Sequence, residues 1–158
     1  LVGMFVIIGA QAATDFVTAT VTVTQSAVEL SQTNVPYGSM ANNTASSTIT
    51  LWAGAGIIAT NQGSVADFDI YGDNSTSWTL ASATSTSNIY AHRFCLQTTT
   101  ECATMWVNYT PLAAGTTELK AGVGIAGTAV FQLEMHTPYT STVFTEQSTT
   151  VTVLASAT

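Results

Sequence analysis

The sequence predicts an all-β protein, an immunoglobulin-like antiparallel β-sandwich that follows a short hydrophobic segment. Three observations predict this class. Apolar residues recur at every second position, turn-forming Gly, Pro and Asn clusters separate these runs, and no stretch after the first sixteen residues has helical periodicity. We therefore divide the chain into a hydrophobic N-terminal assembly segment, residues 1–16, and a β-sandwich domain, residues 17–158.

The first sixteen residues form an apolar block for which two origins are considered. Ala10-Gln11-Ala12 has the small-x-small form of a signal-peptidase site, so the block could be a leftover secretory signal. We instead expect a leader that is cut before Leu1 and an apolar block that stays on the mature chain. The block is shorter than the about 20 apolar residues of a membrane span, so we expect membrane contact only before assembly.

The segment Val17–Thr24 is the first expected strand. Its odd positions are apolar and every even position is Thr, the pattern of a half-buried strand. Val28 and Leu30 lie on even positions, so the phase changes near Gln25–Ala27, where we expect a bulge or a strand switch.

Short strands are expected at intervals along the rest of the chain. The expected ranges are Thr48–Trp52, Val65–Tyr71, Trp78–Leu80, Ile89–Leu96, Ala103–Tyr109, Glu118–Ile125, Ala129–Met135 and Thr149–Leu154. In Val65–Tyr71, Phe68 and Ile70 should face the core and Asp67 and Asp69 should face outward. Turn signals such as Asn61-Gln-Gly63 separate the runs.

The composition excludes several functional classes. Charged residues make up 7% of the chain, against roughly 25% in a typical soluble domain. Thr and Ser together supply 44 of the 158 residues, so hydroxyl groups must keep the surface in water. The net charge is −7, and Arg93 and Lys120 are the only basic residues, which excludes a basic patch for nucleic acid.

Cys95 and Cys102 are separated by six residues, and in an extracellular chain this spacing predicts a disulfide at a hairpin tip. A zinc site would need about four ligands, and His92 and His136 have no typical spacing to these cysteines. We expect neither a metal ion nor another cofactor.

Several segments together resemble secreted immunoglobulin-like domains of microbial surface proteins. They are Val21-Thr-Val-Thr24, Val35-Pro-Tyr-Gly38, Asn61–Ile70, Ser77-Trp-Thr-Leu80, His136-Thr-Pro138 and Val151-Thr-Val153. The apolar N-terminus ahead of a Thr-rich β-domain also resembles archaeal type IV pilin-type and bundling-pilus subunits and bacterial biofilm fibre proteins of the camelysin kind. Type IV pilins carry a longer apolar helix, whereas Thr14 and Asp15 interrupt this block, which puts a helical-core assembly in doubt.

Two modes of assembly through the apolar block are compared. A helix would be apolar on all sides and would need a bundle. A strand would add to the sheet of a neighbour, with alternate side chains buried, and the β-branched run Val6-Ile7-Ile8 favours this mode. The residues expected in the contact are Val2, Met4, Phe5, Val6 and Ile8.

Other polar and aromatic residues have two interpretations each. Asn42, Asn74 and Asn108 match the N-glycosylation pattern, which a Thr-rich chain also produces by chance. Asp67, Asp69 and Asp73 could bind calcium, but the face and turn of one strand explain them more simply. Trp52, Trp78 and Trp106 could form a sugar platform, although buried tryptophans in a sandwich core are commoner.

We expect no enzymatic activity, because His92 and His136 have no nucleophile in a recognisable sequence context. The predicted function is that of a structural subunit of an extracellular filament, a pilus or surface fibre, with other copies of itself as partners. The alternative is a secreted adhesin or carbohydrate-binding module with a surface or glycan ligand.

Overall fold

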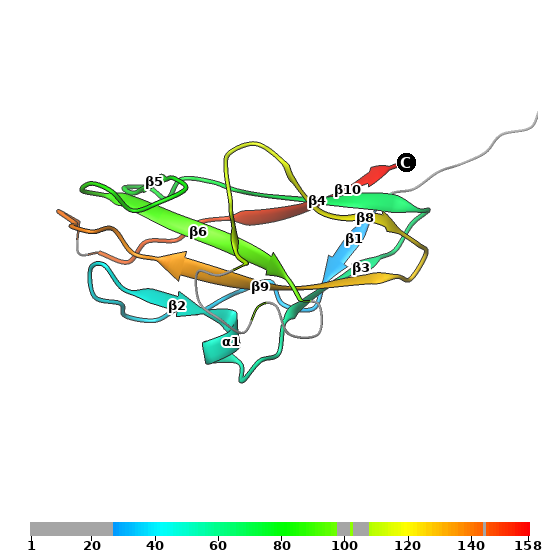
Figure 1. Ribbon diagram of the computed structural model, residues 1–158, viewed down its shortest axis with the longest axis horizontal. Helices are drawn as coiled ribbons and strands as arrows, with labels where there is room; N and C mark the ends of the chain where they lie inside the picture. Colours follow the sequence, from blue (N-terminus) through cyan, green and yellow to red (C-terminus); the bar gives the residue numbers. More distant parts are fainter. Residues whose placement is uncertain (1–26, 98–101, 103–107, 144) are drawn as a thin grey trace, which may run out of the picture.

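The computed structural model describes residues 27–97, 102, 108–143 and 145–158, which form two β-sheets stacked as a sandwich (Figure 1). The strands are β1 (Val28–Leu30), β2 (Ala45–Ser47), β3 (Ile57–Asn61), β4 (Ala66–Gly72), β5 (Thr79–Leu80), β6 (Ile89–Leu96), β7 (Thr110–Pro111), β8 (Thr117–Val123), β9 (Thr128–His136) and β10 (Val151–Ala157). One short helix, α1 (Thr48–Leu51), follows β2. The all-β prediction is confirmed, whereas the immunoglobulin-like arrangement stays a prediction. Residues 1–16 and the expected strand Val17–Thr24 lie outside the described residues.

The two sheets differ in width. The larger sheet has the order β1-β3-β9-β6-β5, with β2 also paired to β9 and β7 to β6, and the smaller sheet has the order β10-β4-β8. The pairing is antiparallel except between β5 and β6, which run parallel, contrary to the expectation of antiparallel pairs alone. In the described part of the chain, β10 pairs with β4 alone and therefore forms an edge of the smaller sheet.

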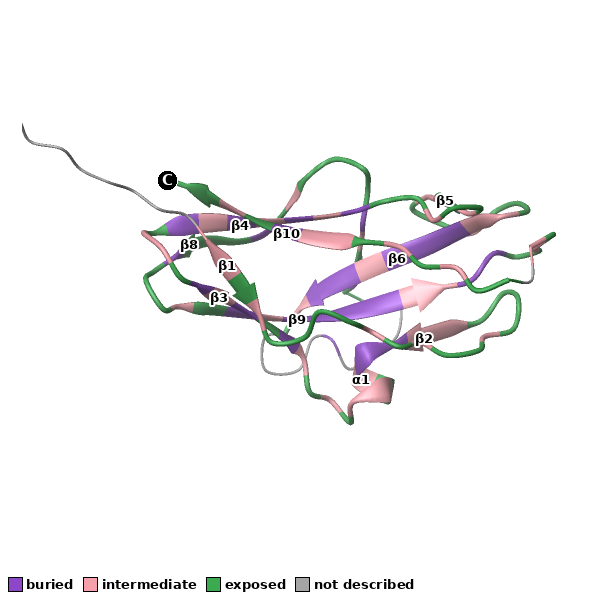
Figure 2. Ribbon diagram, turned by 180° about the vertical axis from the view of Figure 1, so that it is seen from behind, coloured by how far each residue is buried: buried purple, intermediate pink, exposed green. Residues whose placement is uncertain are grey.

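Strand β9 is the centre of the larger sheet. It pairs with β6 along one side, and with β3 and β2 one after the other along the other side. Its alternating sequence turns Phe131 and Leu133 toward the smaller sheet and Gln132 and Glu134 toward the opposite face. All four side chains are buried, so β9 is covered on both faces (Figure 2).

Strand β4 alternates as the sequence predicted. Phe68 and Ile70 are fully buried, and Asp67 and Asp69 point away from the core. The register between β4 and β8 shifts twice near Phe68. Gly122, with a φ of 61°, lies in the irregular part of β8, and its N–H donates to Asp67 Oδ1 at 2.7 Å. Glycine adopts a positive φ more easily than any other residue, so this bulge depends on Gly122.

The expected strand Thr48–Trp52 is wrong, because these residues begin with the helical turn α1. Ser47 caps the helix, since its side chain accepts a hydrogen bond from the Thr50 N–H. The turn places Thr48 over β9, where its hydroxyl receives the Leu133 N–H at 2.9 Å. Local capping and this tertiary contact override the strand preference of Thr and Ile.

Two further expectations differ from the structure. The expected strand Glu118–Ile125 ends at Val123, and Ile125 is 74% exposed in the turn before β9. The expected return strand Ala103–Tyr109 lies largely outside the described residues, and Tyr109 precedes the two-residue strand β7. The sequence analysis also did not identify β3, a central strand of the larger sheet.

We predict that Phe131→Ala lowers the free energy of unfolding by about 3–5 kcal/mol, because Phe131 is 1% exposed and packs at the middle of the core. The matched control is Ile125→Ala, which removes an exposed apolar side chain and should change stability by less than about 0.5 kcal/mol. Urea unfolding measures both variants. Equal losses would contradict the assignment of the core.

Candidate functional site, a groove between the sheets

A cavity of about 780 Å³ lies between the two sheets, beside the edge strand β10. We call it the inter-sheet groove. One wall carries Phe131, Leu133 and Met135 of β9, and Val151 and Val153 of β10 lie on the other. The connecting segments at residues 32–40 and 145–149 complete its lining with Thr, Gln, Asn and Ser side chains. The groove therefore combines apolar side chains of β9 and β10 with a polar rim, the usual composition of a binding site.

The groove opens beside β10 because the smaller sheet is narrower than the larger one. Leu30 of β1 and Ile57 of β3 line the groove from the larger sheet. Val35 packs against the core from the segment that follows β1, and it is half-buried there. Among the described residues, the irregular segment after β1 therefore helps to cover the inner face of the larger sheet at this edge.

His92 and Tyr37 form a polar contact in the lining of the groove. Tyr37 Oη lies 3.0 Å from His92 Nε2, and the two rings meet edge to face at 5.7 Å between centroids. Burial lowers the pKa of His92 to about 4, and burial together with the charge of Glu134 keeps the pKa of Tyr37 far above its ordinary value. Both side chains are therefore neutral near pH 7, which suits an apolar occupant of the groove.

Aromatic side chains continue from His92 along β6. Tyr90 is buried, and its hydroxyl contacts the Asp73 carbonyl and Thr149 Oγ1, the latter at 2.7 Å. Trp78 lies with its ring centroid 6.3 Å from that of Tyr90 and donates from Nε1 to Ser141 Oγ at 3.2 Å. These bonds fix both rings, and of the two it is Trp78 that lines the groove.

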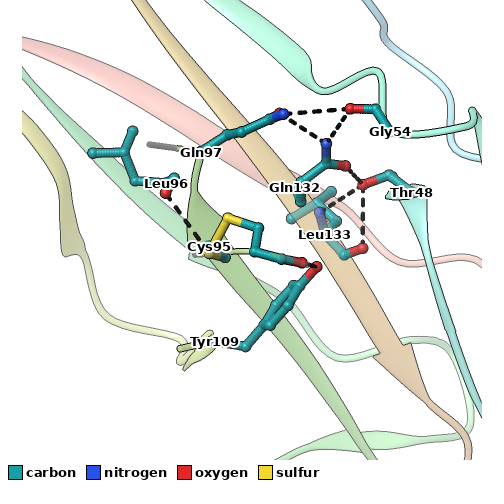
Figure 3. Close-up of a disulfide and its surroundings, with 9 residues drawn as sticks. Thr48, Gly54, Cys95, Leu96, Gln97, Tyr109, Gln132 and Leu133 are labelled. Carbon is teal, nitrogen blue, oxygen red and sulfur yellow. Dashed lines mark hydrogen bonds between the residues drawn. A yellow bond between two sulfur atoms is a disulfide. The ribbon is translucent and has the colours of Figure 1, made fainter. Parts of the chain in front are cut away.

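The opposite face of β9 and β6 is held by the disulfide and a buried amide network (Figure 3). Cys95 and Cys102 form the disulfide that the spacing predicted. Thr48 Oγ1 donates to Gln132 Oε1, and Gln132 Nε2 donates to the Gly54 carbonyl at 3.1 Å and to Gln97 Oε1 at 2.9 Å. This network explains how Gln132 is buried on the face that the alternation predicts to be polar.

Charged groups also lie on this face. Glu134 is fully buried and stands directly opposite Arg93 in the antiparallel register of β9 and β6. Burial and the charge of Glu134 together raise the pKa of Tyr109 to about 12. Sequence reasoning missed this pair of opposite charges on adjacent strands, because the register that aligns them joins residues 41 positions apart.

The structure disperses the polar candidates of the sequence analysis. Among the described residues no three His, Cys, Asp or Glu side chains lie close enough to hold a metal ion, so Asp67, Asp69 and Asp73 do not form a cluster. Asn42, Asn74 and Asn108 are exposed, and their glycosylation stays a prediction. Trp106 and the assembly residues Val2, Met4, Phe5, Val6 and Ile8 lie outside the described residues.

The two histidines have different contacts. His92 contacts Tyr37, and His136 Nδ1 lies 3.3 Å from Thr84 Oγ1. Burial lowers the pKa of His136 as well. In the part of the chain that the structure describes, no helix is long and apolar enough to cross a membrane.

Comparison of the chain with protein-family models, with curated proteins and with solved structures finds no match.

The chain enters the described fold at the end of the sandwich that lies away from the aromatic part of the groove. The Ala27 carbonyl accepts from the Gln62 N–H at 2.9 Å, in the turn between β3 and β4. The C-terminal strand reaches the same end, because Ala157 pairs with Ala66 (Figure 1). The groove extends in the other direction, past Met135 to Thr137.

We predict that His92 makes stability depend on pH. The unfolded chain, with a His pKa of about 6.5, binds more protons than the folded chain between pH 6.5 and about 4. The contribution of neutral His92 to the free energy of unfolding is therefore fully present above pH 6.5. About 3 kcal/mol of it is lost as the pH falls to about 4. Denaturant unfolding at pH 7 and pH 4 should show this loss in the wild type and not in His92→Gln. Equal losses in both proteins would show that another group titrates.

Proposed function

We propose that the protein is a structural subunit of an extracellular filament that polymerises head to tail through the residues before Ala27, which include the apolar segment 1–16. One observation carries the proposal. The chain enters the fold at one end of the sandwich, and the inter-sheet groove extends toward the other. A segment that leaves one copy at its entry end can therefore reach the groove of a copy placed beyond that end.

A contact of this kind propagates. The donated segment and the groove are different surfaces, so each bound copy still offers one of each. Such a heterologous contact makes a filament if the rotation between copies does not close a ring. Strand addition to a sheet edge supplies backbone hydrogen bonds for affinity and alternate side chains for specificity.

The composition supports a location outside the cell. Charged residues make up 7% of the chain, and no Lys or Arg precedes Arg93, so trypsin-like proteases have no cleavage site in the first 92 residues. The disulfide between Cys95 and Cys102 is typical of proteins in oxidising compartments. These properties suit a fibre that is exposed to proteases and oxidants.

A secreted adhesin or carbohydrate-binding module is the second candidate. Trp78 and Tyr37 both line the groove, and the groove has a polar rim of Thr, Gln and Asn side chains. Aromatic rings with nearby hydrogen-bonding groups also suit a sugar. This candidate requires that the protein is a monomer and that a glycan, instead of a segment of another copy, binds in the groove.

We predict that removal of residues 1–24 converts polymers into folded monomers, because every described strand and every described residue that lines the groove lies after Ala27. Size-exclusion chromatography and electron microscopy measure assembly, and far-ultraviolet circular dichroism checks that the β-structure is retained. The matched control replaces residues 1–24 by a Gly-Ser linker of equal length, which should also stay monomeric. Filaments formed by the truncated chain would overturn the proposal.

A further inference from the structure

We propose that Tyr37 and His92 form a redox site that takes up one oxidising equivalent from a one-electron oxidant, such as an oxygen-derived radical in the surrounding water. The oxidant gains one electron from the phenol of Tyr37, and the O–H proton of Tyr37 moves to Nε2 of His92. The products are a neutral tyrosyl radical and an imidazolium, so charge and protons balance. This activity is separate from the filament role and does not depend on assembly.

The hydroxyl of Tyr37 is placed for this proton transfer. Tyr37 Oη lies 3.0 Å from His92 Nε2, which is hydrogen-bonding distance, and the two rings meet edge to face. His92 is 3% exposed, and because burial lowers its pKa, the imidazole is neutral near pH 7 and has a lone pair that takes a proton. Oxidation makes the O–H of a phenol far more acidic than an imidazolium. A hydrogen-bonded imidazole therefore accepts the proton even where burial makes it a weak base.

Two other tyrosines are buried and contact different groups. The hydroxyl of Tyr90 contacts the Asp73 carbonyl and a threonine hydroxyl, and the hydroxyl of Tyr109 donates to the Cys102 carbonyl at 3.4 Å. Neither a carbonyl oxygen nor a neutral hydroxyl takes up a proton at neutral pH. Of these three tyrosines, Tyr37 is therefore the one that can lose an electron and a proton together.

A row of aromatic rings connects this pair with Trp78. Between centroids, the ring of Tyr90 lies 6.5 Å from that of His92 and 6.3 Å from that of Trp78. Trp78 is partly exposed and lines the groove, so an oxidant in water can reach its indole. Electrons pass readily between rings in such close contact, and a tyrosyl radical that has lost its proton is a weaker oxidant than an oxidised indole. Oxidation that begins at Trp78 therefore ends at Tyr37.

The first test oxidises the folded protein with photogenerated tris(bipyridine)ruthenium(III), a one-electron oxidant, and measures the tyrosyl radical by electron paramagnetic resonance. Tyr37→Phe keeps the ring and removes the hydroxyl, so the radical yield should fall about fivefold or more. The matched control is Tyr139→Phe, which changes a tyrosine that is 60% exposed and should leave the yield as in the wild type. Circular dichroism checks that both variants are folded. An unchanged yield in Tyr37→Phe, or an equal loss in Tyr139→Phe, would overturn the proposal.

A second test addresses the proton and begins with the unaltered chain. Because the electron and the proton leave Tyr37 together, the radical should form about twofold more slowly in heavy water, as transient absorption measures. His92→Gln keeps a hydrogen-bond acceptor beside the hydroxyl but cannot take the proton, and its radical yield should fall about fivefold. Equal rates in the two solvents, or a full yield in His92→Gln, would overturn the assignment of His92 as the proton acceptor.

The route through the indole has a test of its own. Phe is much harder to oxidise than Trp, so in Trp78→Phe the Tyr37 radical should form several-fold more slowly. Trp52→Phe is the matched control, because Trp52 packs against the core at the end of α1, and it should leave the rate unchanged. Equal rates in the two variants would overturn the route.

Discussion

The structure depends on the burial of strand β9 on both faces. Phe131 and Leu133 fill the space between the sheets, whereas Gln132 and Glu134 are covered on the other side by α1 and the disulfide region. A buried carboxamide is tolerated only when its hydrogen bonds are made, and Thr48 is one of the groups that make them for Gln132. The helical turn, the disulfide and the central strand therefore stabilise one another.

This arrangement also creates the groove. Because β9 pairs along both sides, the larger sheet extends through β3 to β1 and has more strands than the smaller sheet. The excess width leaves Ile57 and Leu133 lining a groove next to β10. The core cluster nevertheless spans both sheets, since it includes Phe131 and Leu133 of β9 together with Ile70 of β4 and Val153 of β10.

Alternation of apolar and polar residues predicted strands such as β4, whose two faces have different environments. Strand β6 was also predicted, at its observed bounds Ile89–Leu96. Reasoning from one segment at a time failed where distant contacts decide the structure. β3 is a short apolar run whose partner residues, such as Phe131, lie more than 70 positions later. α1 forms because Ser47 caps it and Thr48 reaches Leu133. The disulfide was predicted from its spacing, but the groove was not, since it depends on the relative widths of two sheets.

We propose that copies of the protein join head to tail through the residues before Ala27. The most direct measurement is a cryo-electron microscopy map of the native filament at a resolution that separates β-strands. The proposal predicts density for the N-terminal residues of one copy in the inter-sheet groove of the next copy. An empty groove together with a central bundle of N-terminal helices would contradict it.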